Sequence, residues 1–290
     1  QQLWDFWENH LDPDRGDRKD ELQPLPTLPE RVEGKVVMVT GATSGIGKAT
    51  ALKLARAGAT VLVIARTAEK LEETLQVTAD HGHVDVLVNN AGRSIRRSVV
   101  HSFERFHDYE RTMQLNYFGA LRLIMQLMPG MIERGGGHVI NISSIGVLTN
   151  APRFSAYVAS KAALDAFTRC ASSELAHEGI RFTTINMPLV RTPMIAPTKI
   201  YNHVPTISPA QAADMICDAI VRQPKRIATN LGVMGQVMHF LTPKVTETIM
   251  NTGYKLFSDS SAALGDKESS PKKIRREQAA FSRLFKGIHW

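Results

Sequence analysis

A tyrosine and a lysine four residues apart are the side chains of this sequence best suited to proton transfer. Tyr157 and Lys161 fall in a predicted helix, from about Tyr157 to Ala176, so both side chains project from one face. A tyrosine with a pKa of about 10 is a poor acid near neutral pH, and a neighbouring ammonium group lowers that pKa. We therefore expect Lys161 to lower the pKa of Tyr157. The spacing alone is weak evidence, because most helical tyrosines only pack.

A serine thirteen residues before Tyr157 is the third candidate. Ser144 follows an apolar segment, His138–Ile142, that is predicted to be a strand. In open α/β sheets, ligands bind beyond the carboxyl ends of the strands. Ser144 is therefore expected at the ligand-binding edge of the sheet.

A glycine-rich turn, Thr40 to Gly47, joins a predicted strand to a predicted helix. Gly41 permits the tight turn, Gly45 lets the backbone approach a pyrophosphate, and Gly47 allows the helix to pack closely on the strand. The phosphates then lie at the helix N-terminus, where N–H groups have no partner. A chance glycine-rich turn is the alternative. The expected cofactor contacts are Gly41, Thr43, Ser44, Gly45, Ile46 and Gly47.

The end of the second predicted strand indicates which cofactor is used. Ala65 is followed there by Arg66 and Thr67. An acidic residue at this position binds the free ribose hydroxyls of NAD, whereas a basic one pairs with the 2′-phosphate of NADP. Arg66 and Thr67 therefore favour NADPH, although an arginine at a strand end is also often only solvated.

The elements that position these residues alternate between buried apolar strands and amphipathic helices. This alternation predicts an α/β fold of the Rossmann type, a doubly wound parallel sheet with helices on both faces. Ser208, Pro209 and Gln211 form a capping-box pattern that starts one helix. Strands are expected at Val36–Val39, Thr60–Ile64, Val84–Val88, His138–Ile142, Arg181–Ile185 and Arg226–Thr229, and helices at Gly45–Ala57, Ala68–Leu75, Phe106–Arg134 and Tyr157–Ala176.

One interval of this pattern is too short. Only eighteen residues, Arg66–His83, separate the second predicted strand from the next one. A Rossmann half needs a helix, an edge strand and a second helix there, and a single βαβ unit takes about thirty residues. We infer that the third, edge strand is missing and that the chain is interrupted near residues 72–78.

Charge is unevenly distributed over the 290 residues. The formal net charge is +7, but residues 1–34 hold nine acidic and four basic side chains, so the other 256 carry +12. Such a field attracts polyanions such as nucleotides, CoA or anionic lipid headgroups. Nucleic acid is not expected, because no helix-turn-helix, zinc-finger or RNP pattern accompanies the charge.

The composition divides the chain into three segments and indicates a cellular location. Residues 1–34 are an acidic, proline-rich linker or arm, 35–270 the Rossmann-type domain, and 271–290 a basic amphipathic segment. No apolar run is long enough to span a bilayer, so at most peripheral membrane contact is expected. Cys170 and Cys217 are far apart in predicted helices and should pack as small apolar side chains. A reducing, cytoplasmic location is expected, and no metal site, since His81 and His83 have no ligating neighbours.

The order of these motifs resembles the short-chain dehydrogenase/reductase family. The resemblance implies that Tyr157 protonates the developing oxyanion, that Ser144 donates a second hydrogen bond to it, and that Lys161 holds the nicotinamide ribose. It adds an active-site asparagine, Asn116, which supports a proton relay. The implied cofactor contacts are Asn90, Ala91 and Gly92 of the Asn-Asn-Ala-Gly motif, Tyr157 and Lys161, and Pro188, Val190 and Thr192 of the Pro-x-Val-x-Thr segment.

Several segments look more narrowly like bacterial aldehyde-forming fatty acyl-CoA reductases, which occur alone or as the C-terminal module of a larger reductase. This likeness implies NADPH-dependent reduction of long-chain acyl-CoA to fatty aldehyde, a homo-oligomer, and a possible preceding module in the natural chain. The family's adenine-contacting acid has no counterpart here. The segments are Asn89–Val99, Phe103–Leu123, Asn141–Phe167, Met187–Tyr201 and Phe281–Trp290.

Two other functions are alternatives to this one. A ketone or hydroxysteroid-type reductase would need the same four catalytic side chains, and a non-catalytic cofactor-binding scaffold would not need them intact. Three arginines, Arg93, Arg96 and Arg97, either bind CoA phosphates or are solvated. The methionine-rich stretch Leu231–Met250 either lines an acyl tunnel, touches a membrane or forms ordinary core.

Overall fold

The fold is built on one parallel β-sheet. The computed structural model describes residues 24–64, 82–195 and 205–256. Within them the strand order is β2-β1-β3-β4-β5-β6, and every pairing is parallel. The order reverses between β1 and β3, which is where such sheets bind ligands. The strands are β1 (Val36–Thr40), β2 (Thr60–Ile64), β3 (Val86–Asn89), β4 (Gly137–Ile142), β5 (Ile180–Asn186) and β6 (Arg226–Ala228).

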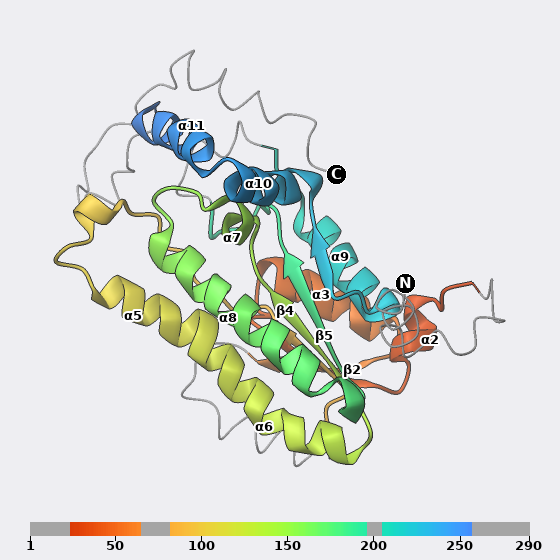
Figure 1. Ribbon diagram of the computed structural model, residues 1–290. Helices are drawn as coiled ribbons and strands as arrows, with labels where there is room; N and C mark the ends of the chain where they lie inside the picture. The colour runs from red at the N-terminus through yellow and green to blue at the C-terminus, as the bar shows by residue number, and fades with distance from the viewer. Residues whose placement is uncertain (1–23, 65–81, 196–204, 257–290) are drawn as a thin grey trace, which may run out of the picture.

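Helices cover both faces of the sheet, which confirms the predicted Rossmann-type architecture (Figure 1). One face packs against α3 (Gly45–Arg56) and α9 (Pro209–Arg222), and the other against α6 (Ala120–Glu133) and α8 (Ser155–Glu174). The remaining helices are α2 (Leu28–Val32), α5 (His107–Met113), α7 (Ile145–Thr149), α10 (Asn230–Leu241) and α11 (Pro243–Leu256), with short 3-10 turns at Val99–His101 and Ala176–Glu178.

The central strand divides its side chains between two cores. Val37 and Val39 of β1 join the cluster under α3 and α9, while Met38 joins the cluster under α6 and α8. Successive strand residues point to opposite faces, so a strand covered on both sides is apolar throughout. All five residues of β1 are buried accordingly.

Strand β2 has a neighbour on one side only within the described residues. Its Val63 is 51% exposed, whereas Leu62 is buried. The predictions that the chain is interrupted near residues 72–78 and that an edge strand is missing there concern residues outside the described ranges. The same holds for Arg66, Thr67, the helix expected at 68–75 and the segments 1–23 and 257–290.

The helix predicted over 106–134 is not continuous. It consists of α5, a π-helical turn at Gln114–Gly119, and α6. The turn contains Asn116, whose side chain is bound to other segments, and π-helical turns in α-helices are frequent at functional sites. By contrast, the predicted start of α9 is confirmed, because Gln211 N donates to Ser208 Oγ and Ser208 N to Gln211 Oε1.

The methionine-rich stretch is not ordinary core. In α10 only Gly232 is buried, whereas Val237 is 48% and Phe240 84% exposed. Helix α10 instead packs on α7 through two glycines, since a Cβ built on Gly232 would lie 2.8 Å from Leu148 Cδ1 and one on Gly235 3.0 Å from Thr149 Cγ2. None of the described helices is long and apolar enough to cross a membrane.

Candidate active site

The candidate site lies at the carboxyl edge of the sheet. Ser144 follows β4 as the N-cap of α7, in extended conformation, and its Oγ accepts a hydrogen bond from Gly146 N at 3.0 Å. This capping interaction fixes the hydroxyl oxygen at the strand end. The structure therefore places Ser144 at the predicted edge.

Tyr157 lies in the first turn of α8, and Ser144 is near enough to its side chain to affect the pKa of the phenol. Burial raises the pKa of Tyr157 above its ordinary value, and this effect exceeds the lowering by Ser144. The expectation that Lys161 lowers this pKa is therefore wrong. Desolvation depends on the packing around the phenol, which the spacing of the two residues does not contain.

Lys161 is 3% exposed and donates from Nζ to the carbonyl oxygen of Ile142 at 2.6 Å. Burial lowers the pKa of its ammonium group to about 8, against an opposing effect of the Asp165 carboxylate. The hydrogen bond ties the lysine to the end of β4, directly before the strand turns to Ser144. Ser144, Tyr157 and Lys161 thus converge on one strand end.

A buried acid behind Lys161 was not among the predicted site residues. Asp165 follows Lys161 by four positions on α8 and is 7% exposed. Its Oδ2 accepts from Asn186 Nδ2 at 3.4 Å, and Asn186 Oδ1 accepts from Arg226 Nε at 2.8 Å. Burial raises the pKa of Asp165, while Ser143, Asn186, Lys161 and Arg169 lower it. The i, i+4 spacing from Lys161 was the signal that would have found it.

Asn116 joins three segments of the site. Its Nδ2 donates to Arg93 O and to Ser160 Oγ, both at 2.9 Å, and its Oδ1 accepts from Arg93 N at 2.8 Å. A Cβ built on Gly92 would lie 3.4 Å from both Asn116 Oδ1 and Lys161 Nζ. The structure therefore brings Asn116 beside Lys161, across the backbone of the Asn-Asn-Ala-Gly segment.

The glycine turn has the geometry of a phosphate cradle. Gly41 and Gly45 have φ values of 68° and 55°, in the left-handed region that favours glycine. A Cβ on Gly47 would lie 2.5 Å from Gly41 O, so the helix packs on the turn as expected. Ser44 caps α3 without a side-chain hydrogen bond, and Thr43 and Ser44 are exposed while Ile46 packs against the core. The first N–H groups of α3 are thus available to an anion.

A threonine that sequence analysis overlooked holds this turn to its neighbour. Thr40 Oγ1 accepts from Asn90 N at 3.0 Å and from Ala91 N at 2.9 Å, and Asn90 Nδ2 donates to Thr40 O. The predicted contact residues Asn90 and Ala91 therefore shape the wall of the cradle.

The segment after β5 closes the other side. Val190 forms a parallel bridge with Ile207, and a Cβ built on Gly45 would lie 3.2 Å from Thr192 Cγ2. Pro188, Val190 and Thr192 are therefore carried past the N-terminus of α3. Between α3 and Lys161 the residues fit a dinucleotide: unpaired helix N–H groups for the pyrophosphate at one end, and Tyr157 and Lys161 for the nicotinamide ribose at the other.

Comparison with known proteins agrees with this geometry. The family model described as short chain dehydrogenase matches residues 35–80 and 74–200. This chain is a short-chain dehydrogenase. The family is one of oxidoreductases. A short-chain dehydrogenase from Streptomyces avermitilis is 30% identical, superposes with a TM-score of 0.62, and covers 76% of this chain and 98% of its own.

The short-chain dehydrogenase is also similar to two curated proteins named "Fatty acyl-CoA reductase". The relative from Acinetobacter baylyi is 54% identical, over 90% of this chain and 97% of its own length. The relative from Mycobacterium tuberculosis is 40% identical, over 77% of this chain and 85% of its own.

The alignment with the Acinetobacter baylyi protein has more positions than the number of residues of this chain that it includes. It has 289 positions, whereas 90% of the 290-residue chain is about 261 residues. About 28 of its positions therefore face no residue of this chain. The family match is itself divided in two, at residues 74–80.

Other sequence expectations concern side chains outside this site. Cys217 is buried, but Cys170 is exposed on α8, so it does not pack as predicted. His83 lies 3.3 Å from the Asp85 carboxylate, and His81 is outside the described residues. Over 24–64, 82–195 and 205–256, no three His, Cys, Asp or Glu side chains are grouped to hold a metal ion.

Proposed function

We propose that this short-chain dehydrogenase reduces long-chain fatty acyl-CoA to the fatty aldehyde, with release of CoA and with NADPH as the reductant. The observation that carries the proposal is the convergence of Ser144, Tyr157 and Lys161 at the end of β4. The similarity over 97% of the Acinetobacter baylyi fatty acyl-CoA reductase supports the choice of substrate.

Each side chain has a defined part in this reaction. A bound nicotinamide supplies the hydride that reaches the thioester carbonyl carbon. Tyr157 donates its proton to the carbonyl oxygen, and Ser144 hydrogen-bonds the same oxygen as its negative charge develops. Lys161 holds the ribose and stabilises the resulting phenolate. The hemithioacetal then collapses: its hydroxyl proton leaves with the CoA thiol, and the aldehyde remains.

The properties of the two cysteines favour direct reduction of the acyl-CoA thioester over a route in which a cysteine first takes up the acyl group. Burial raises the pKa of the Cys217 thiol to about 11, which leaves little of the reactive thiolate at neutral pH. Cys170 is exposed on α8, away from the strand end that carries Ser144. Neither thiol is therefore proposed as a nucleophile.

The deciding experiment is NADPH oxidation by the purified protein with palmitoyl-CoA, with the product identified by mass spectrometry. We expect fatty aldehyde and free CoA in equal amounts. Tyr157→Phe should lower kcat by about 10²-fold or more while NADPH binding is retained, because only the proton donor is lost. Turnover of ketones or hydroxysteroids without turnover of the thioester would assign the same four residues to the alternative reductase.

The preference for NADPH is a proposal that rests on Arg66. Replacing Arg66 by Asp removes a cation and adds a like charge near the 2′-phosphate, so the Kd for NADPH should rise at least about tenfold. The Kd for NADH, which lacks that phosphate, should change little. Equal changes in the two dissociation constants, measured by fluorescence titration, would contradict the assignment.

A further inference from the structure

An arginine of the last strand reaches a buried asparagine behind the candidate site. Arg226 begins β6 and is exposed, whereas Asn186 ends β5 and is buried. Arg226 Nε donates to Asn186 Oδ1 at 2.8 Å. Phe182 of β5 packs in the core under α6 and α8, and side chains two and four residues on share its face of the strand. Asn186 therefore faces α8, and Arg226 meets it there.

The arginine fixes the orientation of the Asn186 amide. A guanidinium group can only donate, so the amide oxygen faces Arg226 and the amide nitrogen faces the opposite way. There Asn186 Nδ2 donates to Asp165 Oδ2 and to Ser144 O, both at 3.4 Å. These bonds are long, which agrees with one amide group shared between two acceptors. If the amide were rotated by half a turn, its oxygen would face the Asp165 carboxylate and the Ser144 carbonyl.

The carboxylate that Asn186 contacts is the one beside Lys161. Asp165 and Lys161 are 7% and 3% exposed, so their mutual attraction is only weakly screened by solvent. The charged or titratable groups that act on Asp165 or are acted on by it are Lys161, Arg169 and Tyr157, all on α8. Arg226 reaches the carboxylate through Asn186. One amide group thus connects the exposed arginine to the acid that favours the Lys161 ammonium.

Helix α10 holds the other side of the arginine. Arg226 Nη2 donates to Gln236 Oε1 at 2.8 Å. Gln236 follows Gly235, where a Cβ would lie 3.0 Å from Thr149 Cγ2 of α7, the helix that Ser144 caps. Helix α10 therefore contacts both the helix that begins at Ser144 and the arginine that orients Asn186.

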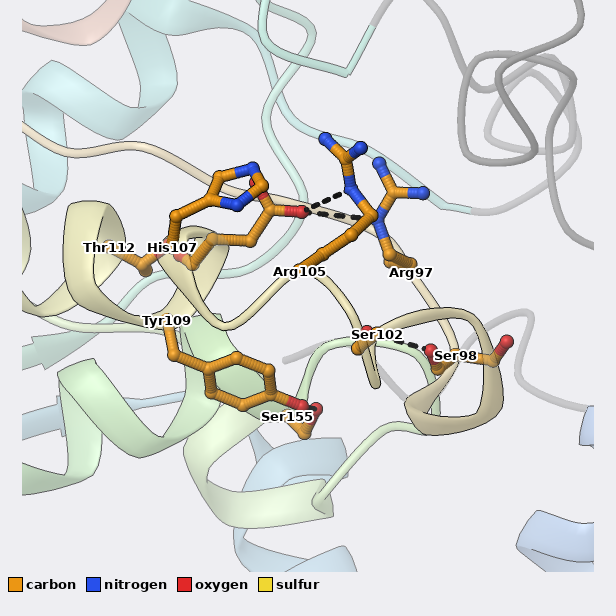
Figure 2. Close-up of polar contacts among 9 residues, drawn as sticks. Arg97, Ser98, Ser102, Arg105, His107, Tyr109, Thr112 and Ser155 are labelled. Atoms are coloured by element: carbon orange, nitrogen blue, oxygen red, sulfur yellow. Dashed lines mark hydrogen bonds and ion pairs between the residues drawn. The ribbon is translucent and has the colours of Figure 1, made fainter.

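The position of α8 is fixed by contacts that do not include the arginine. Figure 2 shows the ring of Tyr109, from α5, extending to Ser155, the first residue of α8, and the two hydroxyl oxygens are 2.8 Å apart. Farther along the helix, Lys161 Nζ donates to Ile142 O at 2.6 Å. Loss of Arg226 should therefore leave α8 in place and change only the buried side chains behind Lys161.

We propose that Arg226, held by Gln236 of α10, is a positioning residue that keeps the Asn186 amide turned toward Asp165 and so keeps that carboxylate beside the Lys161 ammonium group. The arginine acts on Lys161 through two intermediate side chains. The proposal rests on the part given to Lys161 in the proposed function, and it holds whichever carbonyl compound is reduced.

The test measures two pH profiles, that of kcat with palmitoyl-CoA and that of the Kd for NADPH by fluorescence titration. Arg226→Gln should move the basic limb of the kcat profile to lower pH by about 0.5 unit or more, because a carboxylate that turns away or takes up a proton no longer favours the Lys161 ammonium. Lys161 is proposed to hold the ribose, so the pH above which the Kd rises should move in the same direction. Gln236→Leu should give a smaller shift of the same sign.

Matched variants separate this role from stability and from general electrostatics. Lys225→Gln removes the same charge from the neighbouring exposed residue, whose Nζ donates to Ser172 Oγ, and should leave both profiles unchanged. Asp165→Asn alone should shift both profiles to lower pH. Adding Arg226→Gln to it should shift them no further, because the carboxylate on which the arginine acts is already gone.

The outcomes are distinct. If Arg226→Gln lowers the melting temperature and leaves both profiles in place, the arginine is only structural and the proposal is refuted. A further shift in the Asp165→Asn background would also refute it, because Arg226 would then act by another route. If the parent protein shows no basic limb, Lys161 does not need its charge and the proposal fails. If palmitoyl-CoA is not reduced, the proposed function fails, while the Kd profile still tests the role of Arg226.

Discussion

Lys161 is buried beside one acid, Asp165, whose charge partly offsets the effect of burial on the pKa of the lysine. Asp165 raises the pKa of Lys161 against the lowering by burial, and it also raises the pKa of Tyr157. The groups around Asp165 are Ser143, Asn186, Lys161 and Arg169. We therefore propose that Asp165 is a positioning residue that helps to keep Lys161 and Tyr157 protonated.

Replacing Asp165 by Asn should move the pH dependence of activity. Reduction needs Lys161 as the ammonium and Tyr157 as the phenol, so activity falls as pH rises through their pKa values. Without the carboxylate both pKa values fall, and the basic limb of the kcat profile should shift to lower pH. A merely structural role for Asp165 would lower the melting temperature and leave the position of that limb unchanged.

At the scale of single residues, the sequence indicated which side chains lie together at the candidate site better than it indicated their pKa values. Tyr157, Lys161 and Ser144 were found because spacing and strand ends are visible in a sequence. The raised pKa of Tyr157 was missed because it comes from burial. Thr40 was missed because its partners, Asn90 and Ala91, are brought to it only by the pairing of β1 with β3.

Among the elements, helix boundaries were predicted where local chemistry fixes them. The capping box at Ser208 is such a case. The π-helical turn at Gln114–Gly119 was not predicted, because apolar periodicity continues through it from α5 to α6. What distinguishes the turn is the amide of Asn116, which binds the backbone of Arg93 in another segment.

The contact between α7 and α10 gives a prediction at the level of elements. A Cβ at Gly232 would lie 2.8 Å from Leu148 and 3.1 Å from Ile145 of α7, the helix that Ser144 caps. Gly232→Ala should therefore displace α7 and lower kcat severalfold, with a loss of stability of about 1–3 kcal/mol from overpacking. Thermal unfolding and kcat measure the two effects.

A helical glycine with one close neighbour serves as the control. A Cβ on Gly130, inside α6, would lie 3.3 Å from Arg134 Nη1, at the end of a long side chain whose Nη2 donates to Val84 O. Gly130→Ala should thus be neutral or stabilising through its helix propensity. If Gly232→Ala stabilised the protein to the same extent, the close contact with α7 would be unimportant.

In the molecule as a whole, the sequence predicted the parallel sheet that the structure has, and it also predicts that an edge strand is missing. The eighteen residues from Arg66 to His83 cannot hold a complete Rossmann half. The length of the alignment with the Acinetobacter baylyi relative and the divided family match support the proposal that about thirty residues are missing there. The exposed Val63 of β2 is consistent with a strand whose outer neighbour is lacking.

If a segment is missing as we propose, supplying it should raise the affinity for the cofactor. We expect that inserting, between residues 72 and 78, the unmatched segment of the Acinetobacter baylyi relative lowers the Kd for NADPH about tenfold and raises the melting temperature. The reason is that the family's adenine contact belongs to this part of the fold. An insert of equal length made of glycine and serine is the control, and equal effects of the two inserts would contradict the proposal.

The glycines of α10 give this helix one face that contacts α7 and another that is exposed, and this difference matters for engineering the substrate specificity of the enzyme. Gly232 and Gly235 face α7 and leave no room for larger side chains. Three side chains of α10 are not constrained by this contact: Val233, Met234 and Val237, which are 43%, 39% and 48% exposed. A mutant library confined to those three positions can vary the apolar surface near the site freely, because the face that keeps Ser144 in place remains unchanged.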